Sequence, residues 1–491
     1  MQVRVRYAPS PTGLQHIGGV RTALFNYFFA KASGGKFYLR IEDTDQGRYD
    51  GRAVQDIYDT FEWLGITLDE GPREGGPFGP YIQSERIAFY QDAAEQLIAS
   101  GHAYRCFCTA SDLEKMRAEQ AAAGSGTGYD RRCRSISPAT ASMRVAASER
   151  SVVRFKMPTE GSTVVRDILL GDVAWPNKDV SPDPVILKAD GFPTYHLAHA
   201  VDDHLMQTSH VLRGQEWLPS APLHVQLFQA FGWEPPLYCH LSTIMGQDGH
   251  KLSKRHGSTS AQEFRLGGYL PQAVTNYITL LGWSYDGEKD IFTKSELETL
   301  FSLEKLSKSP AVFDYQKLDY YNGYWIRQLP DADIARLIEP ELAKAGLVGA
   351  SAPVSSTERA ILTSAVSIAR ERLHKLADAP AVLGFLFRDP PLTDSASYIP
   401  KKTTAPEVVA VLEKLLPEMA GISGRDDEAN EHHFHSLAET WGLKVGQVLM
   451  PLRLAVTGTT ASPPLMSSIR ILGVDKAVAR VKAVIELLKK A

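Results

Sequence analysis

Apolar and polar residues at the start of the chain follow a pattern that predicts a strand, a loop, a helix and a second strand. Residues 3–7 alternate apolar side chains with arginines, and the prolines and glycine of 8–13 then break the strand. Apolar residues recur at helical spacing over 20–28, a glycine pair at 34–35 ends that helix, and residues 37–42 alternate again. This order is half of a nucleotide-binding sheet, whose ligand lies at the carboxyl ends of the strands.

The same patterns divide the rest of the chain. Strand and helix signals alternate to about residue 105 and return at 185, so the stretch between them, with its cysteines and short strands, is predicted to be an insertion. Beyond residue 325 helical periodicity dominates, and proline-rich breaks at 389–391 and 462–464 are predicted to separate helical bundles. The predicted fold class is α/β, a Rossmann-type domain with an inserted domain, followed by all-α domains. The predicted boundaries are 1–105, 106–184, 185–240, 241–325 and 326–491.

Length and composition narrow the class of protein. A chain of 491 residues is long enough for several domains that each bury a core. Its net charge of −4 gives no strong positive field, so binding of RNA requires local basic patches. Four cysteines, no apolar run of about eighteen residues and a first strand where a signal peptide would stand favour a reducing, cytoplasmic compartment and no membrane.

Two short motifs carry candidate chemistry. His16-Ile17-Gly18-Gly19 places a histidine and glycines at the start of the predicted helix, where backbone N–H groups can face phosphates. Lys251-Leu252-Ser253-Lys254-Arg255 places cations on a predicted loop. Each motif alone is also compatible with a structural role, a turn in the first case and a solvated basic loop in the second. Together they are what an enzyme needs to hold ATP and to stabilise attack on its α-phosphate.

The surrounding residues resemble those of one family. In chain order they are Ala8-Pro9-Ser10-Pro11-Thr12-Gly13, Arg40-Ile41-Glu42-Asp43-Thr44-Asp45, the stretch 195–204, Arg213-Gly214-Gln215-Glu216-Trp217 and the basic motif. With these residues the chain resembles the bacterial glutamyl-tRNA synthetases, which are class I aminoacyl-tRNA synthetases. The resemblance is strong from residue 1 to about 330 and weak in the helical remainder. Glutaminyl enzymes share the plan, but they usually carry histidine where this chain has Gly19 and lack an arginine at the place of Arg213.

The resemblance implies a glutamate–tRNA ligase. Such an enzyme activates L-glutamate with ATP and Mg²⁺ to glutamyl-adenylate, releases pyrophosphate, and transfers glutamate to the 3′-terminal adenosine of tRNA(Glu). The insertion would bind the acceptor end, 241–325 would contact the stem, and the helices beyond 325 would read the anticodon; we expect a monomer. Three alternatives stay open: the truncated paralogue that glutamylates queuosine but lacks the C-terminal helices, a small-molecule nucleotidyltransferase, and an RNA-binding scaffold without activity.

The implied chemistry needs no protein nucleophile, only donors that stabilise charge on phosphate oxygens. The catalytic residues implied by the resemblance are His16, Lys251 and Lys254. Because Gly19 replaces the second histidine of the family signature, His16 carries that role alone. The implied contacts to ATP are Gly18, Gly19, Glu216, Ile244 and Lys254.

Glutamate presents two carboxylates and one ammonium, so its pocket should hold arginines and an acid. Arg6, Glu42 and Arg213 end three predicted strands and would converge at one sheet edge, unless each is a surface ion pair. The histidines and aspartates of 195–204 could be metal ligands, but the family has this stretch without a metal. Position 199 often holds a small polar residue that contacts glutamate, so the histidine here makes that contact uncertain. The implied contacts to glutamate are Arg6, Ala8, Ser10, Glu42, Tyr195, His199 and Arg213.

Three cysteines have the spacing of a structural metal site. Cys106 and Cys108 are followed, after 24 residues, by Cys133, a spacing seen in zinc-containing relatives. Those relatives carry histidine two residues later, where this chain has Ser135, so the fourth ligand of Zn²⁺ would be Tyr129, as in the truncated paralogue, or water. The alternative is three reduced thiols that hold no metal.

Two arginines in the helical half bear on the choice of tRNA. The anticodons for glutamate and glutamine differ at their third nucleotide, C against G, and discriminating relatives use an arginine in this region. Arg370 and Arg372 occupy the matching stretch, and a guanidinium donates to the acceptors of cytosine but clashes with guanine. The sequence therefore predicts an enzyme that charges tRNA(Glu) and not tRNA(Gln). The alternative is that both arginines are solvated or pair with neighbours of Glu371.

Overall fold

The computed structural model describes residues 2–490 except 125, 127, 350–353 and 393. Its internal contacts divide the chain into two compact units. The first unit comprises residues 1–264 and 274–314, and the helical unit comprises residues 265–273 and 315–491. None of the described helices combines the length and the apolar character that crossing a membrane requires.

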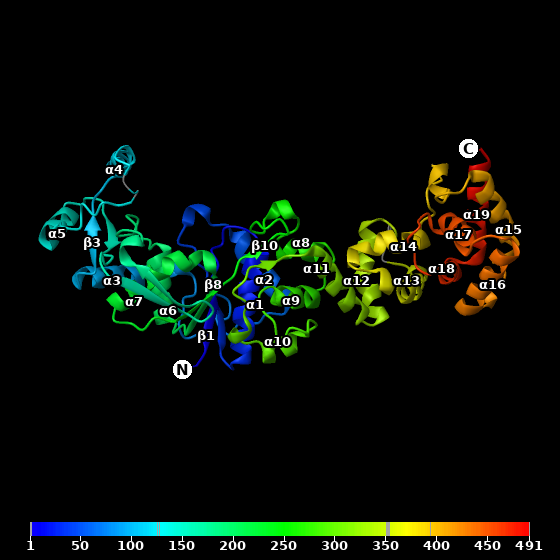
Figure 1. Ribbon diagram of the computed structural model, residues 1–491. Helices are drawn as coiled ribbons and strands as arrows, with labels where there is room; N and C mark the ends of the chain where they lie inside the picture. Colours follow the sequence, from blue (N-terminus) through cyan, green and yellow to red (C-terminus); the bar gives the residue numbers. More distant parts are fainter. Residues whose placement is uncertain (1, 125, 127, 350–353, 393, 491) are drawn as a thin grey trace. The chain divides into compact units, whose positions relative to one another are not determined.

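A parallel sheet lies at the centre of the first unit. β1 (Arg4–Tyr7) pairs in parallel with β2 (Lys36–Leu39), and α1 (Ile17–Ala32) connects the two strands. Hydrogen bonds from the Ser209 amide to the Arg4 carbonyl (2.9 Å) and from the Arg4 amide to the Ser209 hydroxyl (2.8 Å) hold the next strand beside β1. The predicted order of strand, loop, helix and strand is confirmed, and α1 packs against β1 (Figure 1).

That next strand, β8 (His210–Gly214), continues the sheet. It pairs in parallel with β9 (Leu237–Leu241), and α7 (Ala221–Ala230) connects them. Parallel strands with helical crossovers confirm the predicted Rossmann-type class. The carboxyl ends of β1, β2, β8 and β9 therefore meet at one edge, where the sequence predicts the ligand.

The stretch predicted to be an insertion contributes to two sheets. Three strands form an antiparallel sheet: β3 (Ala103–Cys106), β4 (Val152–Phe155) and β7 (Val185–Leu187). The hairpin of β5 (Ser162–Asp167) and β6 (Gly171–Pro176) instead joins the central sheet, because Asp167 pairs in parallel with Tyr238 of β9. Strand pairing thus links 106–184 to the central sheet, which the sequence pattern did not indicate.

Charged residues on the second face of the central strands are buried. Arg4, Arg6 and Arg40 are 7%, 4% and 0% exposed. Arg4 Nη1 lies 2.7 Å from Glu70 Oε1, and Arg40 Nη2 lies 2.9 Å from Glu42 Oε1. The alternation that predicted these strands therefore marks an apolar and an ion-paired face rather than a buried and a solvated one, since a buried charge needs a partner.

The chain contains further elements before and after the basic motif. The helices before the basic motif are α2 (Gly51–Leu64), α3 (Ile87–Ala99), α4 (Ala110–Ala122), α5 (Pro138–Ala146) and α6 (Tyr195–Leu205). β10 (Ile244–Met245) leads into the basic motif and pairs in parallel with β11 (Ala311–Val312). Along the chain, the segment that connects these two strands contains α8 (Ala261–Leu266), α9 (Pro271–Leu280) and α10 (Lys294–Leu300).

The helical unit contains two hydrophobic cores. The first is formed mainly by α12 (Asp331–Lys344), α13 (Ser356–Ala369) and α14 (Ala379–Phe387), and α11 (Tyr315–Arg327) adds Ile326 to it. The second is formed mainly by α15 (Ala405–Met419), α16 (Asp427–Thr440), α17 (Val445–Thr457), α18 (Leu465–Leu472) and α19 (Val474–Lys490). Helices predicted from periodicity over 361–369 and 474–485 are confirmed.

The two proline-rich breaks differ in effect. Residues 389–391 lie between α14 and α15 and so between the two cores, as predicted. Residues 462–464 lie between α17 and α18, whose buried Leu454 and Ile469 belong to the same core. The prediction that this second break separates bundles is therefore wrong, because these prolines only turn the chain within one core.

Candidate active site

A cavity of about 950 Å³ lies at the carboxyl ends of the central strands. Most residues predicted for the site line it: Arg6, Ala8, Ser10, His16, Gly18, Gly19, Glu42, Tyr195, Arg213, Glu216, Ile244 and Lys251. His199 and Lys254 do not line it. Arg21, Arg48 and Lys188 also line the cavity and were missed, because no motif marks them in the sequence.

His16 caps the N-terminus of α1 at the cavity. Its Nδ1 accepts a hydrogen bond from the Gly18 amide (3.1 Å), so the ring proton is on Nε2. Burial and the charge of Lys251 lower the pKa of His16, which keeps the imidazole neutral. The ring therefore offers Nε2–H as a donor beside the positive end of a helix of 16 residues.

Gly19 leaves little room for a side chain. A Cβ at this position would lie 2.6 Å from the Tyr7 hydroxyl, which donates to the Gln15 side chain (2.5 Å). A Cβ at Gly18 would meet its nearest atom at 3.5 Å, an ordinary contact. The second histidine of the family signature therefore has no room at position 19 while Tyr7 keeps this place, which leaves His16 as the histidine donor of the motif.

The basic motif forms a loop that His256 closes. Lys251 lines the cavity, whereas Lys254 begins the short 3₁₀ turn Lys254–His256 outside it. The Ser253 amide donates to His256 Nδ1 (3.0 Å), and His256 Nε2 lies 3.0 Å from Asp248 Oδ1. In this arrangement Lys251 is placed to contact a ligand in the cavity, and the predicted contact of Lys254 stays a prediction.

Arg6 stands in a buried network of charges. Its Nε lies 3.2 Å from Asp203 Oδ1, and Arg40 Nη1 lies 2.7 Å from the same carboxylate. Burial alone would raise the pKa of Asp203, but the charges of Arg6 and Arg40 outweigh it and lower that pKa to about 2. Burial raises the pKa of Glu42, and the charges of Arg40 and Arg6 oppose that rise. The positive charge of Arg6 is thus balanced within the protein.

Arg213 ends β8, is 5% exposed, and has a different environment. Its Nη1 donates to the Tyr195 hydroxyl (3.1 Å). Its Nε donates to His240 Nε2 (3.1 Å), and its Nη2 donates to His224 Nδ1 (3.2 Å). Among the residues that the structure describes, no carboxylate lies within 4.0 Å of the Arg213 guanidinium. A buried positive charge therefore borders the cavity, and none of the described carboxylates is in direct contact with it.

His199 lies one helical turn deeper than Tyr195. It is fully buried, its ring stacks on Tyr195 (5.5 Å between centroids), and its Nδ1 lies 3.0 Å from Asp203 Oδ2. Burial and the charge of Arg213 hold the pKa of His199 well below its usual value. The structure thus places His199 as a support for Tyr195, which corrects the expectation that it contacts glutamate directly.

The alternative of a metal site in 195–204 finds no support. Asp202 is engaged by Arg86 (2.7 Å) and Asp203 by two arginines. Among the described residues, the cluster of metal-type ligands that comes together lies elsewhere, at the three cysteines.

Comparison with known proteins places the chain in a family. Residues 2–320 match the model of the catalytic domain of class I tRNA synthetases (E and Q), and residues 333–485 match the model of an anticodon binding domain. The chain is 50% identical over 489 residues to the glutamate–tRNA ligase of Borreliella burgdorferi, which covers 100% of this chain and 99% of that protein. The chain belongs to the glutamate–tRNA ligase family.

Other members of the glutamate–tRNA ligase family agree over the full length. The enzyme of Treponema denticola is 47% identical over 502 residues, with 99% of each chain covered. A crystal structure of a glutamate tRNA ligase from Elizabethkingia meningosepticum, in complex with its amino acid, has a TM-score of 0.87 at 35% identity and covers 99% of both chains. The predicted family, fold class and type of enzyme are thereby confirmed.

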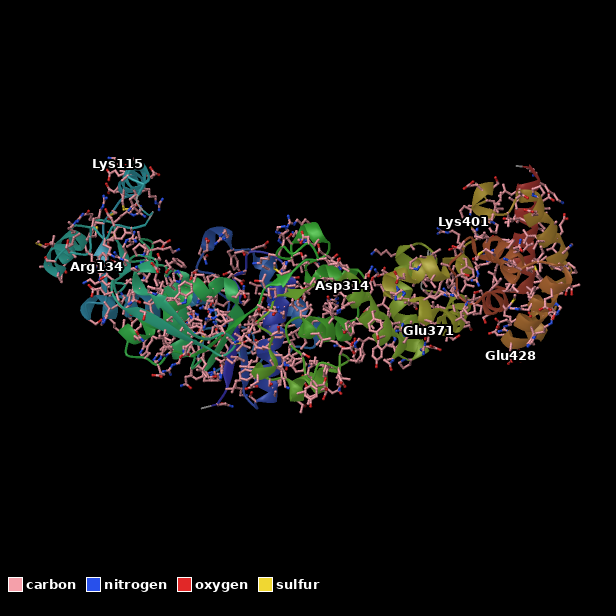
Figure 2. All side chains as sticks on the ribbon, viewed as in Figure 1. Lys115, Arg134, Asp314, Glu371, Lys401 and Glu428 are labelled. Carbon is pink, nitrogen blue, oxygen red and sulfur yellow. The ribbon has the colours of Figure 1, made fainter. Side chains whose placement is uncertain are left out.

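In this family member the three cysteines come together beside Tyr129. The sulfurs of Cys106, Cys108 and Cys133 all lie within 4.8 Å of one another. The Tyr129 hydroxyl is 3.3 Å from Cys106 Sγ and 3.8 Å from Cys108 Sγ, and all four side chains are buried or half-buried. Arg134 (Figure 2), which follows Cys133, is tied down by buried Asp183 (2.8 Å). Three thiols and one phenol oxygen give four donor atoms, the number that a structural tetrahedral metal takes.

The two arginines predicted to read the anticodon are not equivalent. Both lie in the 3₁₀ turn Arg370–Arg372 that follows α13, on either side of exposed Glu371 (Figure 2). Arg370 is tied to the helical unit, because its Nη2 lies 2.5 Å from Asp331 Oδ1 and 2.9 Å from the Leu329 carbonyl. Arg372 is exposed, and no carboxylate in the described part of the chain pairs with it.

Proposed function

We propose that this chain activates L-glutamate with ATP and transfers the glutamyl group to the 3′-terminal adenosine of tRNA(Glu). The observation that carries the proposal is Arg213, a buried arginine at the cavity wall whose described acceptors are all uncharged. A carboxylate is the ligand group that best completes such a site, because it supplies both charge and acceptor oxygens. The side chain of glutamate ends in that group.

Glutamate would lie between the two arginines and Glu42. One hydrogen of Arg213 Nη1 has no acceptor among the described residues, and with the Tyr195 hydroxyl it can hold the side-chain carboxylate. Arg213 Nε and Nη2 are already engaged by histidines, so two nitrogens of this guanidinium are not free for the carboxylate. Glu42 Oε1 accepts a hydrogen bond from Arg40, which leaves Oε2 to accept from the ammonium group of glutamate. Arg6 lines the same cavity and is assigned to the reacting end of glutamate.

The activation step then uses the groups of the two sequence motifs, around His16 and around Lys251. An oxygen of the α-carboxylate attacks the α-phosphorus of ATP, and the bond to pyrophosphate breaks in line. His16 Nε2–H and the N-terminus of α1 stabilise the charge on the phosphate oxygens, and Lys251 stabilises the departing pyrophosphate. Mg²⁺, carried by the phosphates of ATP, supplies further neutralisation of the same charge.

The transfer step needs tRNA. A ribose hydroxyl of the terminal adenosine attacks the glutamyl carbonyl, and AMP leaves. The truncated paralogue lacks C-terminal helices, whereas residues 333–485 here form the helices that match an anticodon binding domain. We therefore assign tRNA(Glu), and not queuosine, as the acceptor.

Incubation with ATP, labelled glutamate and purified tRNA(Glu) tests the proposal. We expect acid-precipitable glutamate that mild base releases; no such product would contradict the proposed function. ATP–pyrophosphate exchange should require tRNA, since the acceptor end completes the pocket in the resembling family. Comparable exchange without tRNA would contradict this order of events but not the ligase activity.

The proposal includes a structural zinc ion held by the three cysteines and Tyr129. Its support is the proximity of three thiols, the preferred donors of structural zinc, with a phenol oxygen beside them as the fourth atom. Metal analysis of protein purified without chelator should find about one zinc per chain, and Tyr129→Phe should bind it less tightly while Tyr320→Phe, at an exposed position, should not. Less than stoichiometric zinc in the unaltered protein, with a melting temperature unchanged by chelator, would indicate free thiols instead.

A further inference from the structure

Besides the Tyr195 hydroxyl and the Trp217 carbonyl, Arg213 donates to two histidines, and each histidine belongs to a hydrogen-bonded pair that the reaction itself does not use. One pair is Asp167 and His240, and the other is His196 and His224. His224 and His240 are both 0% exposed, so neither can exchange its partners for water. Each acceptor must therefore be supplied by the protein in a fixed form.

The tautomer of His240 is fixed by Asp167. Asp167 Oδ2 lies 2.6 Å from His240 Nδ1, and hydrogen bonds from the Leu169 and Leu170 amides (2.9 and 2.8 Å) hold its other oxygen. Because an ionised carboxylate only accepts, Nδ1 must carry the proton. Nε2 of His240 is then left as a lone-pair acceptor for the Nε–H of Arg213.

The tautomer of His224 is fixed by Arg213 and satisfied by His196. Arg213 Nη2 can only donate, so His224 Nδ1 accepts and the proton is on Nε2. His224 Nε2 lies 3.0 Å from His196 Nδ1, which accepts that proton's hydrogen bond. Burial and the charge of Arg213 lower the pKa of His196 to about 4, so both rings stay neutral.

We propose that the pairs Asp167–His240 and His196–His224 are positioning residues that hold the Arg213 guanidinium by neutral acceptors, so that its charge is left for the side-chain carboxylate of glutamate. The proposal rests on the proposed function. It assigns the choice of glutamate over glutamine to these histidines as well as to Arg213 itself.

The reason is the difference between a neutral acceptor and a charged one. A carboxylate at either histidine position would satisfy the same N–H group but would also neutralise Arg213, and the arriving carboxylate would then meet no net attraction. An imidazole satisfies the N–H group and leaves the charge. Glutamine cannot neutralise that charge, so a site that keeps it uncompensated rejects the amide.

The test compares two variants of nearly equal shape, His224→Asp and His224→Asn. Both place an oxygen near the position of Nδ1, and only the first adds a charge. We expect His224→Asp to raise KM for glutamate at least about tenfold, to lower the preference for glutamate over glutamine by a similar factor, and to leave KM for ATP unchanged. His224→Asn should recover most of the glutamate affinity.

Two outcomes would overturn the inference: a folded His224→Asp enzyme with the glutamate KM and selectivity of the unaltered protein, or a His224→Asn enzyme as impaired as His224→Asp. If His224→Asp does not fold, His240→Glu against His240→Gln gives the same test, since both place an oxygen near the position of Nε2 and only glutamate adds a charge. The unaltered enzyme separates the two proposals: if it does not charge tRNA(Glu), the proposed function fails, and if it does while the variants behave alike, only the positioning role fails.

Discussion

Arg6 and Arg213 line the same cavity and are equally buried, at 4% and 5% exposure, yet their partners differ in charge. Arg6 pairs with Asp203, which Arg40 shares. Arg213 donates to a tyrosine hydroxyl and two neutral histidines, with no carboxylate within 4.0 Å in the described part of the chain. One arginine is compensated within the protein, and the other is not.

The difference teaches how to tell a structural arginine from a recognition arginine. A compensated guanidinium fixes the shape of the site and gains little when an anion arrives. An uncompensated guanidinium has lost its hydration without gaining a counter-ion, and a ligand carboxylate relieves this cost. A ligand of the right charge is therefore bound more tightly than a neutral one. The helical unit repeats the contrast, with Arg370 paired to Asp331 and Arg372 exposed.

The largest effect should come from Arg213→Ala. Removing the uncompensated charge should lower kcat/KM for glutamate by about 3–5 kcal/mol, because the substrate carboxylate is then buried without a partner. Arg213→Lys should recover part of this loss, since it restores charge but not the fork of donors. Steady-state aminoacylation measures both, and near-normal glutamate kinetics in Arg213→Ala would disprove the assignment.

Asp203→Asn should disrupt the compensated network around Arg6, and the expected effect is on stability rather than on selectivity. It leaves Arg6 and Arg40 buried without their shared counter-ion, and we expect the free energy of unfolding of the first unit to fall by about 3 kcal/mol. Glu149→Gln, which breaks the exposed pair with Arg144, should leave the free energy of unfolding nearly unchanged, because water screens that pair. Urea unfolding compares the two variants; equal losses would mean that the buried network is not compensating charge.

Low pH should weaken the same network of Asp203, Arg6 and Arg40 over a defined pH range. The pKa of Asp203 is about 2 in the folded protein, below its ordinary value of 3.8, so its contribution is fully present above about pH 4 and is lost as pH falls toward 2. The loss should be about 2 kcal/mol. Asp203→Asn should lack this part of the acid dependence, and an identical pH profile in the variant would contradict the role given to Asp203.

The smallest effect concerns the anticodon. Arg372→Gln should reduce the preference for tRNA(Glu) over tRNA(Gln) by about 1–2 kcal/mol, because only the unpaired arginine is available to a base. Arg370→Gln should instead lower the melting temperature, since it breaks the contact with Asp331, and should leave the choice of tRNA unchanged. Charging of both purified tRNAs measures the preference; equal charging by the unaltered protein would overturn the predicted discrimination.

The sequence was sufficient to predict the sheet edge and the groups that end its strands. Arg6, Glu42 and Arg213 follow predicted parallel strands, and parallel strands bring such residues to one edge. His16 and Lys251 could be placed at the same cavity because each belongs to a motif. Periodicity likewise predicted the C-terminal helices.

The partners of these groups could not be predicted, because distant parts of the chain bring them together. Asp167 meets His240 only because a hairpin from the insertion joins β9, and no spacing in the sequence indicates that pairing. Asp203 could be read as a metal ligand until its arginines were placed. His199 shares a helix face with Tyr195 but lies one helical turn further along. Tyr195 therefore lines the cavity, whereas His199 is buried beneath it.

Selectivity between glutamate and glutamine tests the central claim most directly. The measurement is the ratio of kcat/KM for the two amino acids, with tRNA(Glu) and ATP saturating, in the unaltered protein and in Arg213→Gln. An uncompensated arginine predicts a preference for glutamate on the order of 10⁴ that falls to within about tenfold in the variant. A preference that survives the loss of Arg213 would contradict the account.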